Sequence, residues 1–273
     1  MARQPGVKLG GRGLGSGLLR AVGLLLLCGL SLQLYFVARI GLMAVVAPQS
    51  TTFQRSEIRR LAVHKHPVAW SQAWVDDSRI ADNLKRAVIA SEDAGFIEHS
   101  GVEWDALEKA WEKNQRAEAA AERRQAQIDK RPAAAAAAAA GARPRPVVEP
   151  KLVGGSTISQ QLAKNLFLSG ERTALRKAQE FVLTLTLEAL LGKRRILEIY
   201  LNNVEWGEGI FGAQAAARYY FRTDAARLDS AAAARLAVML PAPKRFEKNP
   251  GSAYVSGRAA TISARMGAVA LPR

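Results

Sequence analysis

The chain has 273 residues, enough for one generous domain or two small ones with a sizeable core. Its formal net charge of +15 favours an anionic partner such as a nucleic acid, a phospholipid or a phosphorylated substrate. The single cysteine, Cys28, excludes an intrachain disulfide and a multi-cysteine metal site, and three histidines without metal-ligand spacing argue against a zinc enzyme.

The N-terminal region carries a long apolar stretch. Residues 21–38 contain no charged side chain, and the apolar character resumes after Arg39 through residue 47. That length can cross a bilayer, and residues 1–20 hold only basic charges. The positive-inside rule therefore predicts a cytoplasmic basic tail (1–20), a transmembrane anchor (21–47) and an exported domain (48–273). A cleaved signal peptide is the alternative, but the run is longer than a usual signal core.

Two acidic residues follow the first helix predicted after the anchor, at about residues 80–91. Glu92 and Asp93 come directly after the apolar stripe of this helix, and Gly95 follows them. This placement suits a carboxylate at the wall of a cleft, where desolvation raises the pKa of a glutamate and fits it for acid–base catalysis. On composition alone, a solvated acidic loop is the alternative.

A second helix is predicted over about residues 103–127 and then gives way to biased sequence. Eight consecutive alanines follow Pro132, and a segment rich in proline and arginine follows them. Proline cannot continue a helix, and alanine has little to bury. We therefore predict a low-complexity insertion over about residues 116–150, partly helical at most and otherwise mobile.

The segment 154–165 predicts a helix start that suits an anion. Thr157 with Gln160 three residues later has the form of a capping box, and two glycines precede it. Gln160, Gln161, Lys164 and Asn165 then share one face, beside the free amides of the helix N-terminus. Such a site fits a phosphate group. An ordinary polar helix start is the alternative, and the order of residues in a Walker loop is missing.

A long helix is predicted over about residues 173–191. It places Arg176 next to Glu180, four residues apart, and is otherwise apolar nearly all round. We expect such a helix to be buried, which makes Glu180 and Glu188 costly unless they are paired or functional. A purely structural Arg176–Glu180 ion pair is the alternative.

The rest of the chain predicts further helices. Their approximate ranges are 194–202, 214–221, 230–240 and 256–266, with a glycine-rich turn at 206–212. No convincing alternating strand pattern is present, so the exported part is expected to be mainly α.

Five motifs, in order between about residues 80 and 250, resemble those of glycosyltransferase family 51, the peptidoglycan transglycosylases, and most closely the monofunctional biosynthetic type. They are Glu92-Asp93-x-x-Phe96-x-x-His99-x-Gly101, Gly155-Ser156-Thr157-Ile158-x-Gln160-Gln161-x-x-Lys164-Asn165, Arg176-Lys177-x-x-Glu180, Lys193-x-x-Ile196-Leu197-x-x-Tyr200-Leu201-Asn202 and Leu240-Pro241-x-Pro243. The resemblance implies a lysozyme-like, mainly helical fold, with a large lobe and a small membrane-proximal lobe around a cleft.

The resemblance also implies an activity. Lipid II, a disaccharide-peptide joined through pyrophosphate to a polyprenyl tail, would be polymerised into linear glycan with a β-1,4 link, inversion at the donor carbon and release of polyprenyl pyrophosphate. Glu92 would be the general base and Glu180 would stabilise the donor side. Since the chain ends soon after the fifth motif, no transpeptidation is expected.

Binding roles follow from the same resemblance. The substrate-binding residues would be Ser156, Gln160, Gln161, Lys164, Asn165, Arg172, Arg176 and Lys177, and the first motif would be supported by Asp93, Phe96, His99 and Gly101. A divalent cation, magnesium or manganese, is expected near Glu180 or Asp93, with no organic cofactor.

The expected partners are lipid II, the growing glycan, membrane lipids and other cell-wall synthesis or division proteins. The expected location is the bacterial inner membrane, crossed once, with the N-terminus cytoplasmic and the catalytic domain periplasmic. Nucleic acid is a poor partner because export removes the domain from the cytoplasm.

Two other functions compete with polymerisation. A lysozyme-like fold could instead hydrolyse glycan, because hydrolases also use two carboxylates. The cationic cluster of Lys164, Arg172, Arg176 and Lys177 argues against this, since a neutral glycosidic bond has no use for it. The other alternative is an inactive scaffold for cell-wall synthesis complexes, against which the presence of Glu92 and Glu180 argues.

Overall fold

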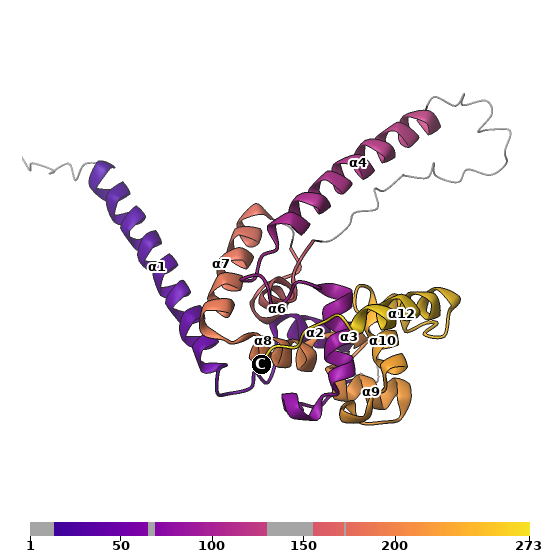
Figure 1. Ribbon diagram of the computed structural model, residues 1–273. Helices are drawn as coiled ribbons and strands as arrows, with labels where there is room; N and C mark the ends of the chain where they lie inside the picture. The colour runs from indigo at the N-terminus through magenta and orange to yellow at the C-terminus, as the bar shows by residue number, and fades with distance from the viewer. Residues whose placement is uncertain (1–13, 65–68, 130–154, 172) are drawn as a thin grey trace, which may run out of the picture. The chain divides into compact units, whose positions relative to one another are not determined.

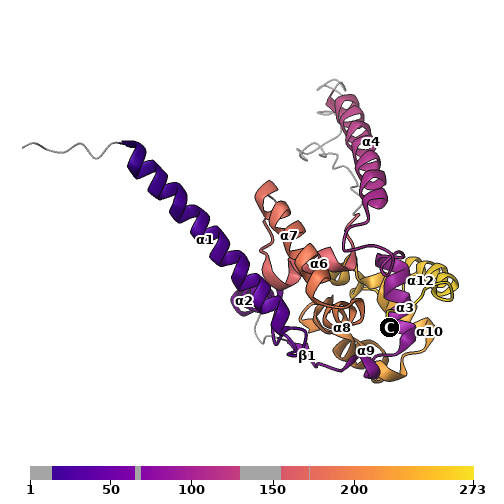
Figure 2. The same cartoon turned by 60° about the vertical axis from the view of Figure 1, so that its left-hand side comes forward.

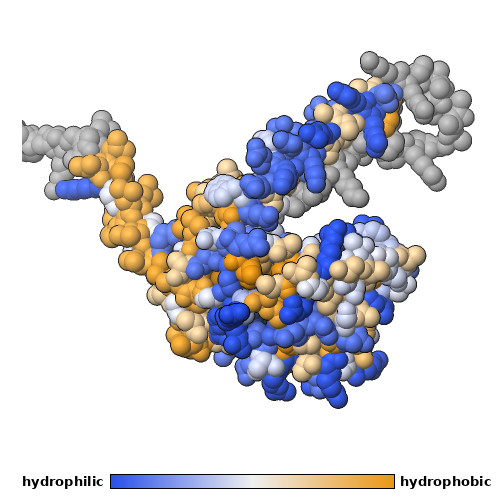
Figure 3. Space-filling view, in the orientation of Figure 1, coloured by the Kyte–Doolittle hydropathy of each residue, from blue (hydrophilic) through white to orange (hydrophobic). Residues whose placement is uncertain are grey.

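The computed structural model describes residues 14–64, 69–129, 155–171 and 173–273, and the chain divides into two compact units, Met1–Ala47 and Pro48–Arg273. The first unit holds α1 (Leu14–Leu42), whose surface is almost wholly hydrophobic (Figure 3). Its segment Gly17–Leu42 is long and apolar enough to cross a membrane. The helix begins before residue 21, because Leu18 and Leu19 are good helix formers, and it gives way after Leu42 to turns rather than reaching residue 47.

The second unit is mainly α-helical, as predicted. Its longer helices are α2 (Thr52–His64), α3 (Asp82–Glu92), α4 (Trp104–Asp129), α6 (Ile158–Phe167), α7 (Ala174–Leu190), α8 (Lys193–Asn203), α9 (Ala213–Phe221), α10 (Ser230–Met239) and α12 (Ala253–Met266). Short 3₁₀ and α turns complete them: η1 (Asp77–Arg79), η2 (Ala225–Arg227) and α11 (Pro243–Phe246).

The core forms around α8. This helix is buried from Ile196 to its last residue; α6 and α7 pack against it, and α2 packs against α6. On the other side, α3 packs against α10 and α12 (Figures 1 and 2). The polar end of α8 is buried without an unpaired group, because the Asn202 amide donates to the backbone oxygen of Val75 and accepts from its N–H, both at 2.9 Å.

A small sheet replaces the predicted glycine-rich turn at 206–212. Its strand order is β1 (Ser71–Gln72), β3 (Ile210–Phe211), β2 (Glu205–Gly207), with β1 parallel and β2 antiparallel to β3. Strands of two or three residues are too short to show an alternating pattern. Gly209 is required at the hairpin: its φ is +73°, and a Cβ there would lie 2.1 Å from the oxygen of Ala69.

Two further differences concern α7 and α4. The prediction that α7 is buried all round is wrong, because Leu175 is 82% exposed and Val182 and Leu185 are 44% exposed each. An all-round apolar pattern shows that a helix avoids water but does not say whether protein or another apolar phase covers it. The helix α4 extends to Asp129, into the predicted insertion, whose remaining residues, 130–150, lie outside the described chain.

Candidate active site

Glu92 is the last residue of α3 and carries its carboxylate into a largely buried setting. Burial raises the pKa of this carboxyl, and the neighbouring Asp93 adds to the rise. Hydrogen bonds from the Gln161 Nε2 and the Ser91 hydroxyl oppose it. A glutamate with a raised pKa is a stronger base when ionised, which is what general-base catalysis requires.

A relay of hydrogen bonds orients the Glu92 carboxylate. The Tyr200 hydroxyl donates to Gln161 Oε1 at 2.9 Å, and Gln161 Nε2 donates to Glu92 Oε2 at 3.1 Å. Burial, followed by the charges of Glu92 and Asp93, raises the pKa of Tyr200 well above its usual range, so the hydroxyl keeps its proton. The tyrosine therefore fixes the Gln161 amide with its NH₂ group toward the base.

Asp93 ties the first motif to the second. Its Oδ1 accepts from His99 Nε2 at 2.8 Å, and its Oδ2 accepts from the N–H of Ile158, the first residue of α6, at 2.9 Å. His99 Nδ1 in turn accepts from the N–H of Gly101 at 3.1 Å, which fixes the proton on Nε2. His99 is thus a structural hydrogen-bonding group.

The backbone of the two motifs also meets directly. The Thr157 hydroxyl donates to the oxygen of Gly101 at 2.7 Å. Gly101 has a φ of +89°, and a Cβ there would lie 2.8 Å from side-chain carbons of Thr184 and Glu188. Gly101 and Thr157, which precede and follow the insertion in the sequence, are therefore held together, and the two motifs meet despite the insertion.

The predicted capping box at the start of α6 is confirmed. Thr157 Oγ1 accepts from the N–H of Gln160, and Gln160 Oε1 accepts from the N–H of Thr157, both at 3.1 Å. The Gln160 oxygen is thereby engaged in the fold, and its amide nitrogen is the atom left for a ligand.

The other side of the site is a carboxylate held between two cations. Glu180 is buried in α7, its Oε2 lies 2.9 Å from a guanidinium nitrogen of Arg176, and its Oε1 contacts Lys177 Nζ. Arg176 and Glu180 are neighbours on one helix face, as predicted, and they form the ion pair that the sequence left as the alternative. Lys177 is half exposed and Arg176 also lines the cleft, so both cations are placed to meet an anion there.

Glu188, also predicted to need a partner, has two. Its Oε1 accepts from the Ser159 hydroxyl and lies 2.8 Å from Lys193 Nζ. Glu188 is a structural group that joins α7 to α6. No sequence pattern predicted its contact with Ser159, because the two residues are 29 positions apart.

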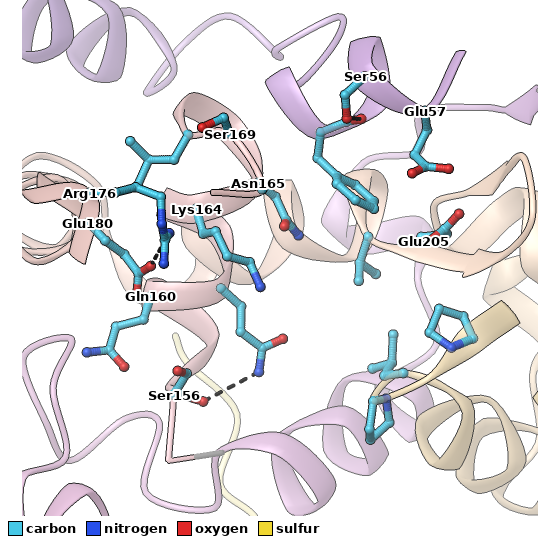
Figure 4. A pocket seen from close by; sticks show the side chains of 18 of the residues that line it. Ser56, Glu57, Ser156, Gln160, Lys164, Asn165, Ser169, Arg176, Glu180 and Glu205 are labelled. Atoms are coloured by element: carbon cyan, nitrogen blue, oxygen red, sulfur yellow. Dashed lines mark hydrogen bonds and ion pairs between the residues drawn. The ribbon is translucent and has the colours of Figure 1, made fainter. Parts of the chain in front are cut away.

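A cleft of about 620 Å³ joins these groups (Figure 4). Eight of the predicted site residues line it: Ser156, Gln160, Gln161, Lys164, Asn165, Arg176, Lys177 and Glu180. Leu240, Pro241 and Pro243 of the fifth motif form part of another wall. Glu92 is not among the lining residues but accepts a hydrogen bond from Gln161, which is. The lining also does not include Asp93, Phe96, His99 or Gly101. Arg172 lies outside the described residues.

Two acidic lining residues were not predicted. Glu57 of α2 and Glu205 of β2 lie on the same side of the cleft, opposite Arg176 and Glu180 (Figure 4). They come from segments far apart in sequence, and neither falls in a motif, so no sequence signal brings them together.

The residues at the two places predicted for a divalent cation do not fit one. Ligand atoms of Asp93, His99 and Glu103 lie within 4.8 Å of one another, but both Asp93 oxygens accept hydrogen bonds and both His99 nitrogens are engaged. At Glu180 the two carboxylate oxygens already face Arg176 and Lys177.

A buried, hydrogen-bonded carboxylate next to a cleft that is lined by cations is typical of enzymes that transfer a group away from a diphosphate. The chain belongs to the transglycosylase family, whose model matches residues 60–124 and 133–267.

The chain is also 44% identical to a biosynthetic peptidoglycan transglycosylase of Paraburkholderia phytofirmans, over 89% of this chain and 88% of the relative. It is 48% identical to a protein of the same name from Burkholderia thailandensis, over 89% of this chain and 83% of the relative. The resemblance seen in the motifs is therefore confirmed.

Proposed function

We propose that the chain polymerises lipid II into linear peptidoglycan glycan strands. The observation that carries this is that one cleft is lined both by Gln161, which donates to Glu92, and by the cationic cluster around Glu180. The name shared by the relatives supports the same reaction. A hydrolase would need no cluster of cations beside its cleft.

In this reaction Glu92 takes the proton of the acceptor sugar's 4-hydroxyl. The oxygen attacks the anomeric carbon of the growing chain, the bond from that carbon to the pyrophosphate oxygen breaks, and its electron pair leaves with the pyrophosphate. Lys164, Arg176 and Lys177, together with Arg172, stabilise the negative charge as it develops. Glu180 holds Arg176 and Lys177 in place, while Ser156, Gln160, Gln161 and Asn165 orient sugars and phosphates.

The expected magnesium or manganese remains a prediction, and no step of this scheme uses it. Both carboxylate oxygens of Asp93 and of Glu180 already have partners in the protein. We therefore expect such a cation to arrive bound to the pyrophosphate of the substrate, and not to occupy a site formed by protein side chains alone. A chelator titration of the polymerisation rate tests this.

The membrane is the proposed location. The apolar α1 would cross the inner membrane once, with the basic N-terminus cytoplasmic and the catalytic domain periplasmic. The exposed apolar face of α7, with Leu175, Val182 and Leu185, would contact lipid acyl chains, because an uncharged apolar surface of this extent is unfavourable in water.

The test is to incubate the detergent-solubilised protein with labelled lipid II and to measure polymer that lysozyme can digest. Wild type should form polymer, and Glu92→Gln, which keeps the size but not the base, should lose at least about 10²-fold in rate. Glu180→Gln should lose rate through misplaced cations. Cleavage of preformed glycan without synthesis would make the protein a hydrolase, and neither activity in a folded protein would leave the scaffold.

A further inference from the structure

One oxygen of the Glu205 carboxylate is buried without a well-formed hydrogen bond. The residue is 6% exposed, and its Oε1 has no hydrogen-bond partner of good geometry within the described chain. Its nearest partner is Lys244 Nζ of α11, at an ion-pair distance of 3.4 Å from Oε1. A buried carboxylate whose partner is a single lysine at 3.4 Å keeps much of its desolvation cost, so such a group at a cleft wall suggests a further donor from a ligand.

Lys244 joins this carboxylate to Glu57. Its Nζ lies 2.5 Å from Glu57 Oε2, which also accepts from Arg60 Nε at 2.9 Å. The charge of Glu57 is therefore already balanced by two cations, and the Arg60 guanidinium reaches Glu208 as well. One end of the cleft thus holds two carboxylates bridged by one lysine, which we call the acidic subsite (Glu57, Glu205 and Lys244).

The acidic subsite belongs to the same cleft as the cationic cluster. Figure 4 shows Glu57 and Glu205 across the cleft from Arg176 and Glu180, with the Lys164 and Asn165 side chains between the two groups. A ligand that places its diphosphate on the cations would extend its uncharged part toward the acidic subsite. Phe53 and Val204 provide apolar wall beside it.

The charges of the subsite indicate whether it binds a cationic group or a neutral hydrogen-bond donor of a ligand. An ammonium group would compete with Lys244, which already lies between the two carboxylates. A hydroxyl or amide N–H needs no change in charge and supplies the donor that Glu205 lacks. Sugar rings carry such donors at their edges and apolar C–H groups on their faces.

We propose that the acidic subsite binds an uncharged sugar ring of the glycan, with the Glu205 carboxylate accepting a hydrogen bond from a hydroxyl or acetamido N–H. This assignment rests on the proposed function, because it takes glycan to be the occupant of the cleft. Glu205 is then a positioning residue, and Lys244 holds the two carboxylates together.

The experiment measures sugar binding apart from turnover. The full-length protein in detergent is titrated, by ligand-observed NMR, with an uncharged tetramer of β-1,4-linked N-acetylglucosamine and with its fully deacetylated, cationic counterpart. Glu205→Met should lower the affinity for the neutral tetramer about tenfold or more, whereas Glu205→Gln, whose amide oxygen still accepts, should lose less. Glu98→Met is the control, because Glu98 is an exposed glutamate outside the cleft lining, and it should bind like wild type.

A second readout is the dependence of polymerisation on lipid II concentration. Glu205→Met should raise KM more than it lowers kcat. Thermal unfolding checks each variant, and if Glu205→Met is unfolded, Glu57→Gln replaces it and should lower neutral-tetramer affinity several-fold.

Three results would overturn the proposal: no binding of the neutral tetramer by wild type, the same affinity in wild type and the folded variants, or tighter binding of the cationic tetramer that depends on Glu205. The last would make the subsite a receptor for ammonium groups. Absence of polymer from wild type would count against the proposed function instead, because sugar affinity is measured without turnover.

Discussion

At the scale of single residues, the Gln161 amide sets the basicity of Glu92. Its hydrogen bond stabilises the ionised carboxylate and so opposes the rise in pKa caused by burial. In Gln161→Leu this donor is gone, and the pKa of Glu92 should rise further. Because the base must be ionised, the acidic limb of the pH profile of kcat/KM should move to higher pH, by up to roughly one unit.

Tyr200→Phe provides the matched comparison. It removes the hydroxyl that holds Gln161 but leaves the amide in place, so the limb should move in the same direction by less. A pH profile unchanged in both variants would mean that Gln161 does not tune the base.

Glu205 also makes a prediction about stability. Burial raises the pKa of this carboxyl to about 7 from its ordinary value of 4.5, and the ion pair with Lys244 only partly opposes this. Since the folded state holds the proton more tightly than the unfolded state, stability should fall as pH rises from about 4.5 to 7 and stay lower above it. Glu205→Gln cannot ionise, so it should avoid this loss.

The measurement is the thermal midpoint in detergent at pH 5 and pH 8. Relative to wild type, Glu205→Gln should gain on the order of 1–2 kcal/mol at pH 8, a few degrees in midpoint, and much less at pH 5. An equal effect at both pH values would show that Glu205 is ionised throughout.

Residues close in sequence were the predictable part of the site. The Thr157–Gln160 box and the Arg176–Glu180 pair lie three and four residues apart, where helix geometry alone makes them neighbours. Glu57 and Glu205 meet only because α2 and β2 fold against the same cleft, and no local pattern encodes that contact.

At the scale of elements, α7 separates two tasks on two faces. Glu180 and Leu183 face inward, whereas Val182 and Leu185 lie on the exposed apolar side. If lipid covers that side, Leu185→Glu should slow polymerisation several-fold in liposomes, since it places a charge against acyl chains, and should have little effect in detergent. Parallel assays in the two media provide the measurement, and Leu185→Ala is the uncharged control. Equal rates of Leu185→Glu and Leu185→Ala in liposomes would argue against lipid contact.

Helix boundaries were predicted best where the apolar periodicity of the sequence is strongest. Long apolar-periodic helices such as α3 and α8 were predicted to within one or two residues. The helix α2 was missed because its sequence is rich in arginine and polar side chains, and its buried residues, Gln54, Glu57 and Leu61, include only one apolar side chain. Tertiary contacts, rather than an apolar stripe, stabilise that helix.

At the scale of the whole molecule, the two halves of the site are closed by contacts that bypass the insertion. Asp93 binds the N–H of Ile158, Thr157 binds the oxygen of Gly101, and Gly155 approaches Ala110 so closely that a Cβ would lie 2.9 Å from the alanine methyl. The first turns of α4 are therefore part of the catalytic unit. No residue of the described part of α4 lines the cleft.

These contacts predict that residues 116–148 can be deleted. Residue 115 lies five residues beyond Ala110, about 7.5 Å along the helix, and the six residues 149–154 that remain can span about 20 Å, enough to reach Gly155. The deletion should keep polymerisation within about tenfold of wild type, or 1.4 kcal/mol in barrier. Replacing residues 116–148 by a glycine–serine linker of equal length is the control. A larger loss in both would assign the insertion a role in glycan handling, whereas a loss in the deletion alone would show that closure of the loop, and not its sequence, supports the cleft.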